Sequence, residues 1–132
     1  MTTHPRCRVL LVDDTPEIRE LLRITLEIDG RFEIVGEAED GAAAIDLTES
    51  EVPDAVVLDL AMPVMDGLQA IPEIRKHCPN TKILVLSGFD ARQMSKEAIS
   101  RGAHAYVEKG QNITELATML VELCEGRRVG LI

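Results

Sequence analysis

Aromatic residues, paired cysteines and long apolar runs are scarce or absent in this sequence. Tryptophan is missing, and aromatic residues make up only 2% of the 132 residues. Any hydrophobic core must therefore be built from aliphatic side chains. No apolar run approaches the roughly 18 residues that a membrane span needs, and the first residues lack the apolar segment of a signal peptide. We therefore expect a cytoplasmic protein that does not enter a membrane.

Cysteines and basic residues are also few. Cys7, Cys78 and Cys124 are widely spaced and form no CxxC pair, so we expect all three to be reduced. Lys and Arg number 14 against 23 Asp and Glu, which gives a net charge of −9. This charge repels phosphate backbones and anionic lipids, and we expect no direct nucleic-acid or membrane binding. It suits a site that attracts a divalent cation.

Short runs of aliphatic and β-branched residues recur along the chain and predict buried strands. Their nearly continuous hydrophobicity fits parallel strands that are covered on both faces. The five predicted strands are Arg8–Val12, Glu33–Ala38, Ala55–Leu58, Lys82–Leu86 and Ala105–Glu108.

Amphipathic segments follow each predicted strand and indicate helices. The first three are expected over Pro16–Ile28, over Gly41–Ser50 and after Asp66, which forms a capping box with Gln69. Pro72 lies inside the third segment, where we expect a late start or a kink. The fourth is expected over Ala91–Arg101, and the fifth opens at Asn112.

This alternation predicts an α/β fold. Five βα units require a parallel sheet with right-handed crossovers and helices on both faces. The doubly wound, flavodoxin-like strand order 2-1-3-4-5 suits five strands and places a ligand crevice at the carboxyl ends of the first and third strands. We expect residues 1–132 to form a single domain with a core of about 8–125, and no output domain.

Polar side chains stand where the predicted strands end. Asp13 and Asp14 follow the first strand, Asp59 the third, Ser87 the fourth and Lys109 the fifth. Three carboxylates in one crevice repel one another, and a hard cation such as Mg²⁺ (or Mn²⁺) would relieve that repulsion. Asp13 and Asp14 could instead only favour the start of a helix, but the third acid at the neighbouring strand end favours a metal site. A carboxylate such as Asp59 can also attack phosphorus.

Four segments together resemble the receiver domains of two-component response regulators. They are LLVDD, VVLDLAMPVMDG, ILVLSG and AYVEKG, in the same order and at compatible spacing, and the resemblance extends from about Arg8 to Glu125. It implies a phosphorylation-dependent switch that is not an enzyme in the ordinary sense. Each motif is weak alone, but the set is specific.

The resemblance assigns a role to each matching residue. Asp59 would be the phosphoacceptor, and Asp13, Asp14, Asp59 and the backbone carbonyl of Ala61 would hold the metal. Lys109 would contact the phosphoryl group, while Ser87 and Tyr106 would be the switch residues. Pro63 and Gly67 would shape the loop beside Asp59.

The sequence departs from the family pattern at three positions. Gly110 replaces the proline that commonly follows the lysine, so the cis Lys-Pro bond is lost and the loop should be more mobile. Ala61 and Phe89 occupy positions that tune phosphorylation and hydrolysis in the family, and neither side chain can orient water. We therefore expect a longer-lived phosphoryl group than in chemotaxis-type receivers.

The resemblance implies a sensor histidine kinase or a phosphotransfer protein as phosphodonor. It also implies a downstream effector that reads the face formed by the fourth helix, the fifth strand and the fifth helix. A homodimer through these elements stays open. Three alternatives remain: a degenerate receiver that only binds partners, an aspartate-nucleophile phosphohydrolase and a flavodoxin-like cofactor binder. Ala61 stands where the phosphohydrolase needs a second acid, and the chain has neither GxGxxG nor GxxxxGK[ST].

Overall fold

The computed structural model describes residues 6–110 and 113–126, and it confirms the predicted fold class. Within these residues, five parallel strands form one sheet in the order β2-β1-β3-β4-β5. The strands are β1 (Cys7–Val12), β2 (Phe32–Ala38), β3 (Ala55–Leu58), β4 (Lys82–Ser87) and β5 (Ala105–Glu108).

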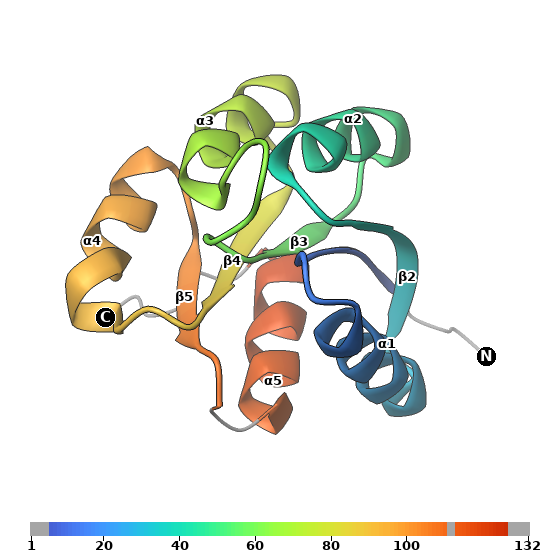
Figure 1. Cartoon of the computed structure of the whole chain (residues 1–132). Coiled ribbons are helices and arrows are strands. Elements are labelled where there is room, and N and C mark those ends of the chain that lie inside the picture. The colour runs from blue at the N-terminus through green and yellow to red at the C-terminus, as the bar shows by residue number, and fades with distance from the viewer. Residues whose placement is uncertain (1–5, 111–112, 127–132) are drawn as a thin grey trace.

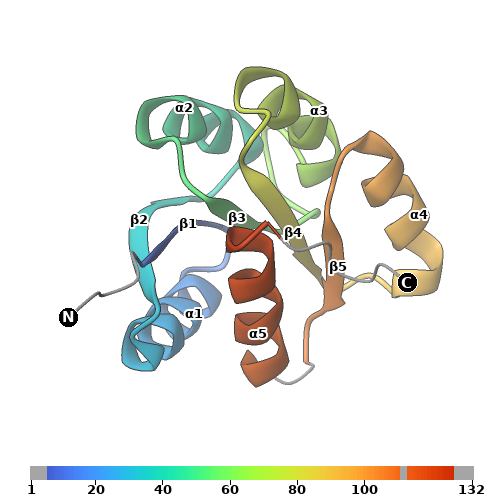
Figure 2. The same cartoon turned by 180° about the vertical axis from the view of Figure 1, so that it is seen from behind.

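In the described part of the chain, five helices cover the two faces of the sheet (Figure 1). They are α1 (Pro16–Asp29), α2 (Gly41–Glu51), α3 (Gly67–His77), α4 (Ala91–Arg101) and α5 (Ile113–Cys124). The expected opening of the last helix at Asn112 lies outside the described residues. Helices α1 and α5 lie on one face, and α2, α3 and α4 on the other, as the view from behind also shows (Figure 2).

Two aliphatic cores result from this layering. One contains Leu22 and Leu26 of α1 and Leu116 and Leu120 of α5, packed on one face of the sheet. The other contains residues of α3 and α4 packed on the opposite face, with Ile71 and Ile74 fully buried. Burial of the central strands on both faces explains why their sequences are continuously hydrophobic.

Helix α3 begins directly after Asp66 and contains Pro72, so of the two outcomes expected there, a late start or a kink, the late start is wrong. The predicted capping box is present, because Asp66 accepts from the Gln69 amide and Gln69 accepts from the Asp66 amide. Pro72 cannot donate to the carbonyl of Leu68 four residues earlier. That carbonyl instead accepts a hydrogen bond from the guanidinium of Arg101, at 3.2 Å. A residue of α4 thus compensates for the proline.

The expectation of three reduced cysteines is wrong for two of them. Cys7 at the start of β1 and Cys124 at the end of α5 form a disulfide, with their Cα atoms 6.0 Å apart. Cys78 is free and buried. The two paired residues are 117 positions apart in the sequence, so no local cysteine motif could predict the pairing. Only the fold brings them together.

An apolar stripe remains exposed on α1. Leu21, Ile24 and Ile28 are 53%, 43% and 80% exposed, and their spacing places them on one side of the helix. Leu22 and Leu26 face the core instead. No helix among the described residues is long and apolar enough to cross a membrane.

Candidate functional site

The parallel register of β1 and β3 places three carboxylates side by side. Val12 pairs with Leu58, and the Asp59 amide donates to the Val12 carbonyl at 2.9 Å. One carboxylate oxygen each of Asp13, Asp14 and Asp59 lies within 4.8 Å of the others. Asp13 and Asp59 are only 2% and 3% exposed, whereas Asp14 is exposed. Adjacent strand ends thus build one acidic crevice.

Lys109 brings the positive charge to this crevice from the end of β5. Its Nζ lies 2.9 Å from Oδ2 of Asp13 and 3.3 Å from Oδ2 of Asp59. Its backbone amide donates to the Ser87 carbonyl at 2.7 Å, which extends the β4–β5 pairing by one residue. The lysine therefore bridges the two buried acids.

Burial and like charge disfavour the ionised form of Asp59. Burial and the nearby Asp13 carboxylate raise the pKa of Asp59, although Lys109 opposes them. Burial would lower the pKa of Lys109, but its bond to Asp13 and the charge of Asp59 outweigh that effect and raise the pKa. The pocket thus holds an ammonium group and more negative charge than that group can balance.

The donor set suits a hard divalent cation. Mg²⁺ prefers oxygen ligands and is usually held by one or two carboxylates together with waters and substrate phosphate. Asp13, Asp14 and Asp59 offer oxygens only, and one of these acids is open to solvent. Three carboxylates and a single lysine leave a net negative charge, which attracts a doubly charged cation.

Ser87, the last residue of β4, and Tyr106 of β5 both contact the turn between β4 and α4. Ser87 is fully buried, and its Oγ accepts from the Phe89 amide at 3.1 Å. Tyr106 is half-buried, and its hydroxyl donates to the Phe89 carbonyl at 2.9 Å. Both predicted switch residues thus bond to the backbone of Phe89: the Ser87 oxygen accepts from its amide, and the Tyr106 hydroxyl donates to its carbonyl.

The loop after β3 closes tightly on Asp59. The Gly67 amide donates to the Leu60 carbonyl at 2.9 Å, and a Cβ at Gly67 would meet the Asp59 carbonyl at 2.2 Å. The Met65 amide donates to the Pro63 carbonyl at 2.7 Å. Ala61 is exposed, and its amide lies 3.4 Å from Oδ1 of Asp59. Only glycine allows α3 to begin so close to the acid.

A family model for the response regulator receiver domain matches residues 9–121. The chain belongs to this family.

Two curated relatives place the receiver domain in two-component signalling. It is 35% identical over 124 residues to the probable transcriptional regulatory protein NarL of Mycobacterium tuberculosis, covering 94% of this chain and 57% of that protein. It is 37% identical over 102 residues to the chemotaxis protein CheY of Halobacterium salinarum, covering 77% and 83% of the two chains. The chain spans about half the length of the transcriptional regulators it matches.

A solved structure agrees with the family assignment. The signal receiver domain of the putative response regulator NarL from Mycobacterium tuberculosis superposes with a TM-score of 0.89 at 34% identity. The alignment covers 94% of this chain and all of that one. Receiver domains are signalling regulators, and this structure shares their architecture.

Arg19 and Glu108 are two residues beside the receiver crevice to which sequence reasoning gave no role. The Arg19 guanidinium, from the second turn of α1, donates to the Asp13 carbonyl and pairs with Glu37 of β2 at 3.0 Å. Glu108 accepts from the Ala91 amide at 2.7 Å. A basic residue five positions after Asp14 was the available signal for Arg19, and a place beside Lys109 was the signal for Glu108.

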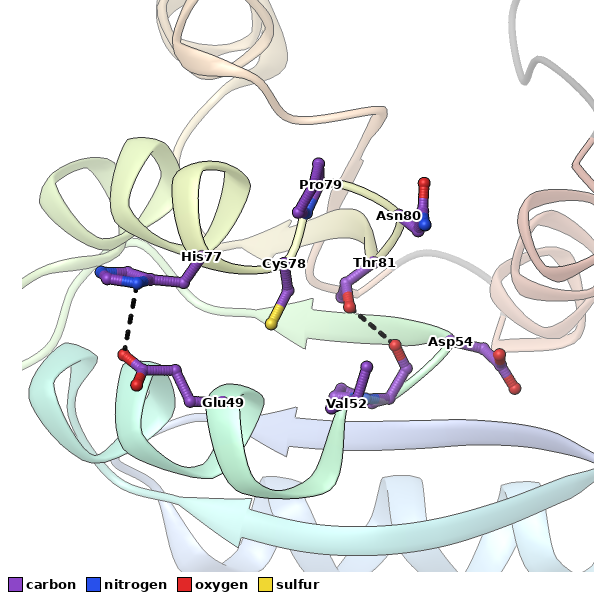
Figure 3. A pocket seen from close by; sticks show the side chains of 9 residues that line it. Glu49, Val52, Asp54, His77, Cys78, Pro79, Asn80 and Thr81 are labelled. Carbon is purple, nitrogen blue, oxygen red and sulfur yellow. Dashed lines mark hydrogen bonds and ion pairs between the residues drawn. The ribbon is translucent and has the colours of Figure 1, made fainter.

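A second pocket of the receiver domain lies at the opposite edge of the sheet (Figure 3). It measures about 450 Å³ and is lined by residues that precede β3 and β4, among them Asp54, Asn80 and Thr81. His77 approaches Glu49 at 3.7 Å, and Thr81 donates to the Pro53 carbonyl at 2.7 Å. Its position at the amino ends of the strands separates it from the acidic crevice.

Proposed function

We propose that this receiver domain is a switch that accepts a phosphoryl group on Asp59. The bridging of Asp13 and Asp59 by Lys109, beside a third acid, carries the proposal. The proposal also includes that residues 1–132 act as one receiver domain and that the protein is located in the cytoplasm. A disulfide is unusual in that compartment, so counting free thiols in protein extracted under alkylation tests the location and the cross-link together.

In the proposed reaction, a phosphohistidine of a sensor kinase or phosphotransfer protein is the donor. A carboxylate oxygen of Asp59 bonds to phosphorus, the phosphorus–nitrogen bond breaks, and the donor imidazole keeps the electron pair. Lys109 neutralises charge on the transferred group. Asp13, Asp14, Asp59 and the Ala61 carbonyl would hold Mg²⁺ or Mn²⁺. The ion would stabilise the charge that spreads over the phosphoryl oxygens.

Phosphorylation would then alter the surface read by a partner. The phosphoryl group carries about 1.5–2 negative charges and replaces the single charge of the Asp59 carboxylate, so the strand ends gain roughly one negative charge. Ser87 would move toward the new oxygens, and Tyr106 would fill the space that is vacated. The effector would read the face formed by α4, β5 and α5, and a homodimer through the same face is compatible with this role.

Labelling with a small phosphodonor such as phosphoramidate tests the proposal. In the presence of Mg²⁺, intact mass should increase by one phosphoryl group in the wild type but not in Asp59→Asn. Asp46→Asn, an exposed acid on α2, is the matched control and should label normally. Absence of labelling in the wild type would identify a degenerate receiver, and turnover of a phosphate ester would identify a phosphohydrolase.

The lifetime of the phosphoryl group is a separate part of the proposal. Ala61 carries no acid, amide or base beside Asp59, and Phe89 is 44% exposed at the neighbouring turn. Neither side chain can orient an attacking water. We expect the labelled protein to outlast chemotaxis-type receivers, and loss of the label within seconds would contradict this.

A further inference from the structure

Two side chains of β5 hold the turn between β4 and α4. Tyr106 and Glu108 are alternate residues of the strand, so they project from the same face. The Tyr106 hydroxyl donates to the Phe89 carbonyl at 2.9 Å, and Oε1 of Glu108 accepts from the Ala91 amide at 2.7 Å. Both are half-buried. The segment that follows Ser87 is therefore held at two points by one neighbouring strand.

The Glu108 contact has the chemistry of a strong hydrogen bond. Ala91 is the first residue of α4, and first-turn amides have no partner within the helix and lie at the positive end of its dipole. A carboxylate there makes a charge-assisted bond. Asp90 already caps the neighbouring amide of Arg92 at 2.7 Å. Asp90 is a local cap, whereas Glu108 joins the helix to a different strand.

This contact is linked to the phosphorylation site through the adjacent residue. Lys109 follows Glu108 directly, and its amide donates to the Ser87 carbonyl at 2.7 Å. The backbone from Ser87 to Ala91 is thus attached to β5 at both ends. Ser87 Oγ accepts from the Phe89 amide, so movement of this side chain toward a group on Asp59 would break that bond and release the turn.

We propose that Glu108 is a positioning residue that holds the β4–α4 turn in its resting arrangement. It thereby sets the fraction of molecules in which Ser87 is placed for the phosphoryl group. This inference rests on the proposed function. A bond made only in the resting state lowers the population of the other state, and its removal must tighten binding of any ligand that prefers that other state.

Two measurements on Glu108→Ala test the inference. The first is hydrogen exchange of the Ala91 amide in the unphosphorylated protein, which should become faster. The second is the affinity for beryllofluoride, a phosphoryl mimic, in the presence of Mg²⁺. We expect it to tighten by about fivefold, a typical coupling between two states. Glu108→Gln keeps an acceptor oxygen without the charge and should lie between wild type and Glu108→Ala in both measurements.

Glu97→Ala is the matched control. Glu97 is an exposed acid on the same helix that pairs with Arg101 at 2.9 Å, away from the turn. Its loss should change neither the Ala91 exchange nor the beryllofluoride affinity. A general loosening of α4, which thermal melting would register, can therefore be separated from loss of the contact with β5.

The outcomes separate the two proposals. Unchanged exchange at Ala91, or unchanged or weaker beryllofluoride binding in Glu108→Ala, would overturn the role of Glu108 while leaving the proposed function intact. Absence of beryllofluoride binding in the wild type would instead refute the proposed function and this inference with it.

Discussion

At the scale of single residues, the position of Asp59 suits phosphorylation but lowers the free energy of unfolding. It is 3% exposed and lies beside another buried acid. Its raised pKa means that folding disfavours the ionised form, so its charge opposes stability at neutral pH. Functional sites commonly carry such a cost.

Asp59→Asn should therefore stabilise the protein while abolishing phosphorylation. Removing one unfavourable buried charge typically raises the free energy of unfolding by about 0.5–2 kcal/mol. Urea unfolding at neutral pH without divalent cations would measure this, with Asp46→Asn as the surface control. A destabilised Asp59→Asn would show that Lys109 fully compensates the charge.

Gly67 is the second residue on which the crevice depends sterically. Its Cβ would clash with the Asp59 carbonyl, so Gly67→Ala must displace either α3 or the acid. We expect a loss of about 1–3 kcal/mol in unfolding free energy together with slower labelling by phosphoramidate.

Gly88→Ala is the control for Gly67→Ala. A Cβ at Gly88 meets nothing within 4 Å, and the backbone there does not require a positive φ. Its stability should stay within about 0.5 kcal/mol of the wild type. Equal effects of the two substitutions would show that the close approach at Gly67 is not what constrains the loop.

At the scale of elements, α1 has two apolar sides with different uses. Leu22 and Leu26 pack into the core, whereas Leu21, Ile24 and Ile28 form the exposed stripe. Exposed apolar side chains that share one helix side often mark a contact surface. Since α1 begins beside Asp13 and Asp14, a partner that presents phosphohistidine to the crevice could cover this stripe.

We predict that Leu21→Glu slows phosphotransfer from the cognate kinase by about tenfold, as for a central interface residue. Labelling by phosphoramidate should not change, because Leu21 is 53% exposed and lies outside the crevice. Ile99→Glu on α4, where the side chain is 47% exposed, is the matched control. Normal transfer to Leu21→Glu would exclude α1 from the docking surface.

At the scale of the whole molecule, the Cys7–Cys124 disulfide connects the two ends of the described fold. A cross-link stabilises mainly by restricting the unfolded chain, and the sequence separation here is 117. Reduction should lower the free energy of unfolding by about 2–4 kcal/mol. Melting with and without reductant measures this, and Cys124→Ser should not respond to reductant. Three titratable thiols in the untreated protein would contradict the prediction.

His104 makes the stability of the whole fold depend on pH. Its Nδ1 accepts from the Ile83 amide at 3.0 Å. Burial, with help from the charges of Arg75 and Lys82, lowers its pKa from 6.5 to about 4. The unfolded chain therefore binds the proton more readily, so this stability is present above pH 6.5 and is lost as the pH falls toward 4.

The expected loss over that range is on the order of 2–3 kcal/mol. It should be much smaller in His104→Asn, whose side-chain oxygen can accept from the Ile83 amide but does not titrate. Urea unfolding of both proteins at several pH values makes the comparison. Identical pH profiles would assign the acid sensitivity to other groups.

The sequence predicted the order of the elements because local hydrophobic patterns reflect burial. Helix ends marked by capping residues were also predictable, as Asp66 and Gln69 show. The late start at Pro72 was wrong because the compensating donor, Arg101, lies 33 residues from Leu68 in the sequence. No local pattern can report such a partner.

By itself, the sequence determined the α/β class, the strand-end positions of the polar residues and the family to which the chain belongs. Those properties follow from side-chain periodicity and from motifs that are short and local. Only the tertiary structure decided the contacts of Lys109 with two acids, the hold of Glu108 on α4 and the pairing of Cys7 with Cys124. Each joins segments far apart along the chain, and their distances are fixed only when the sheet and its helices have packed.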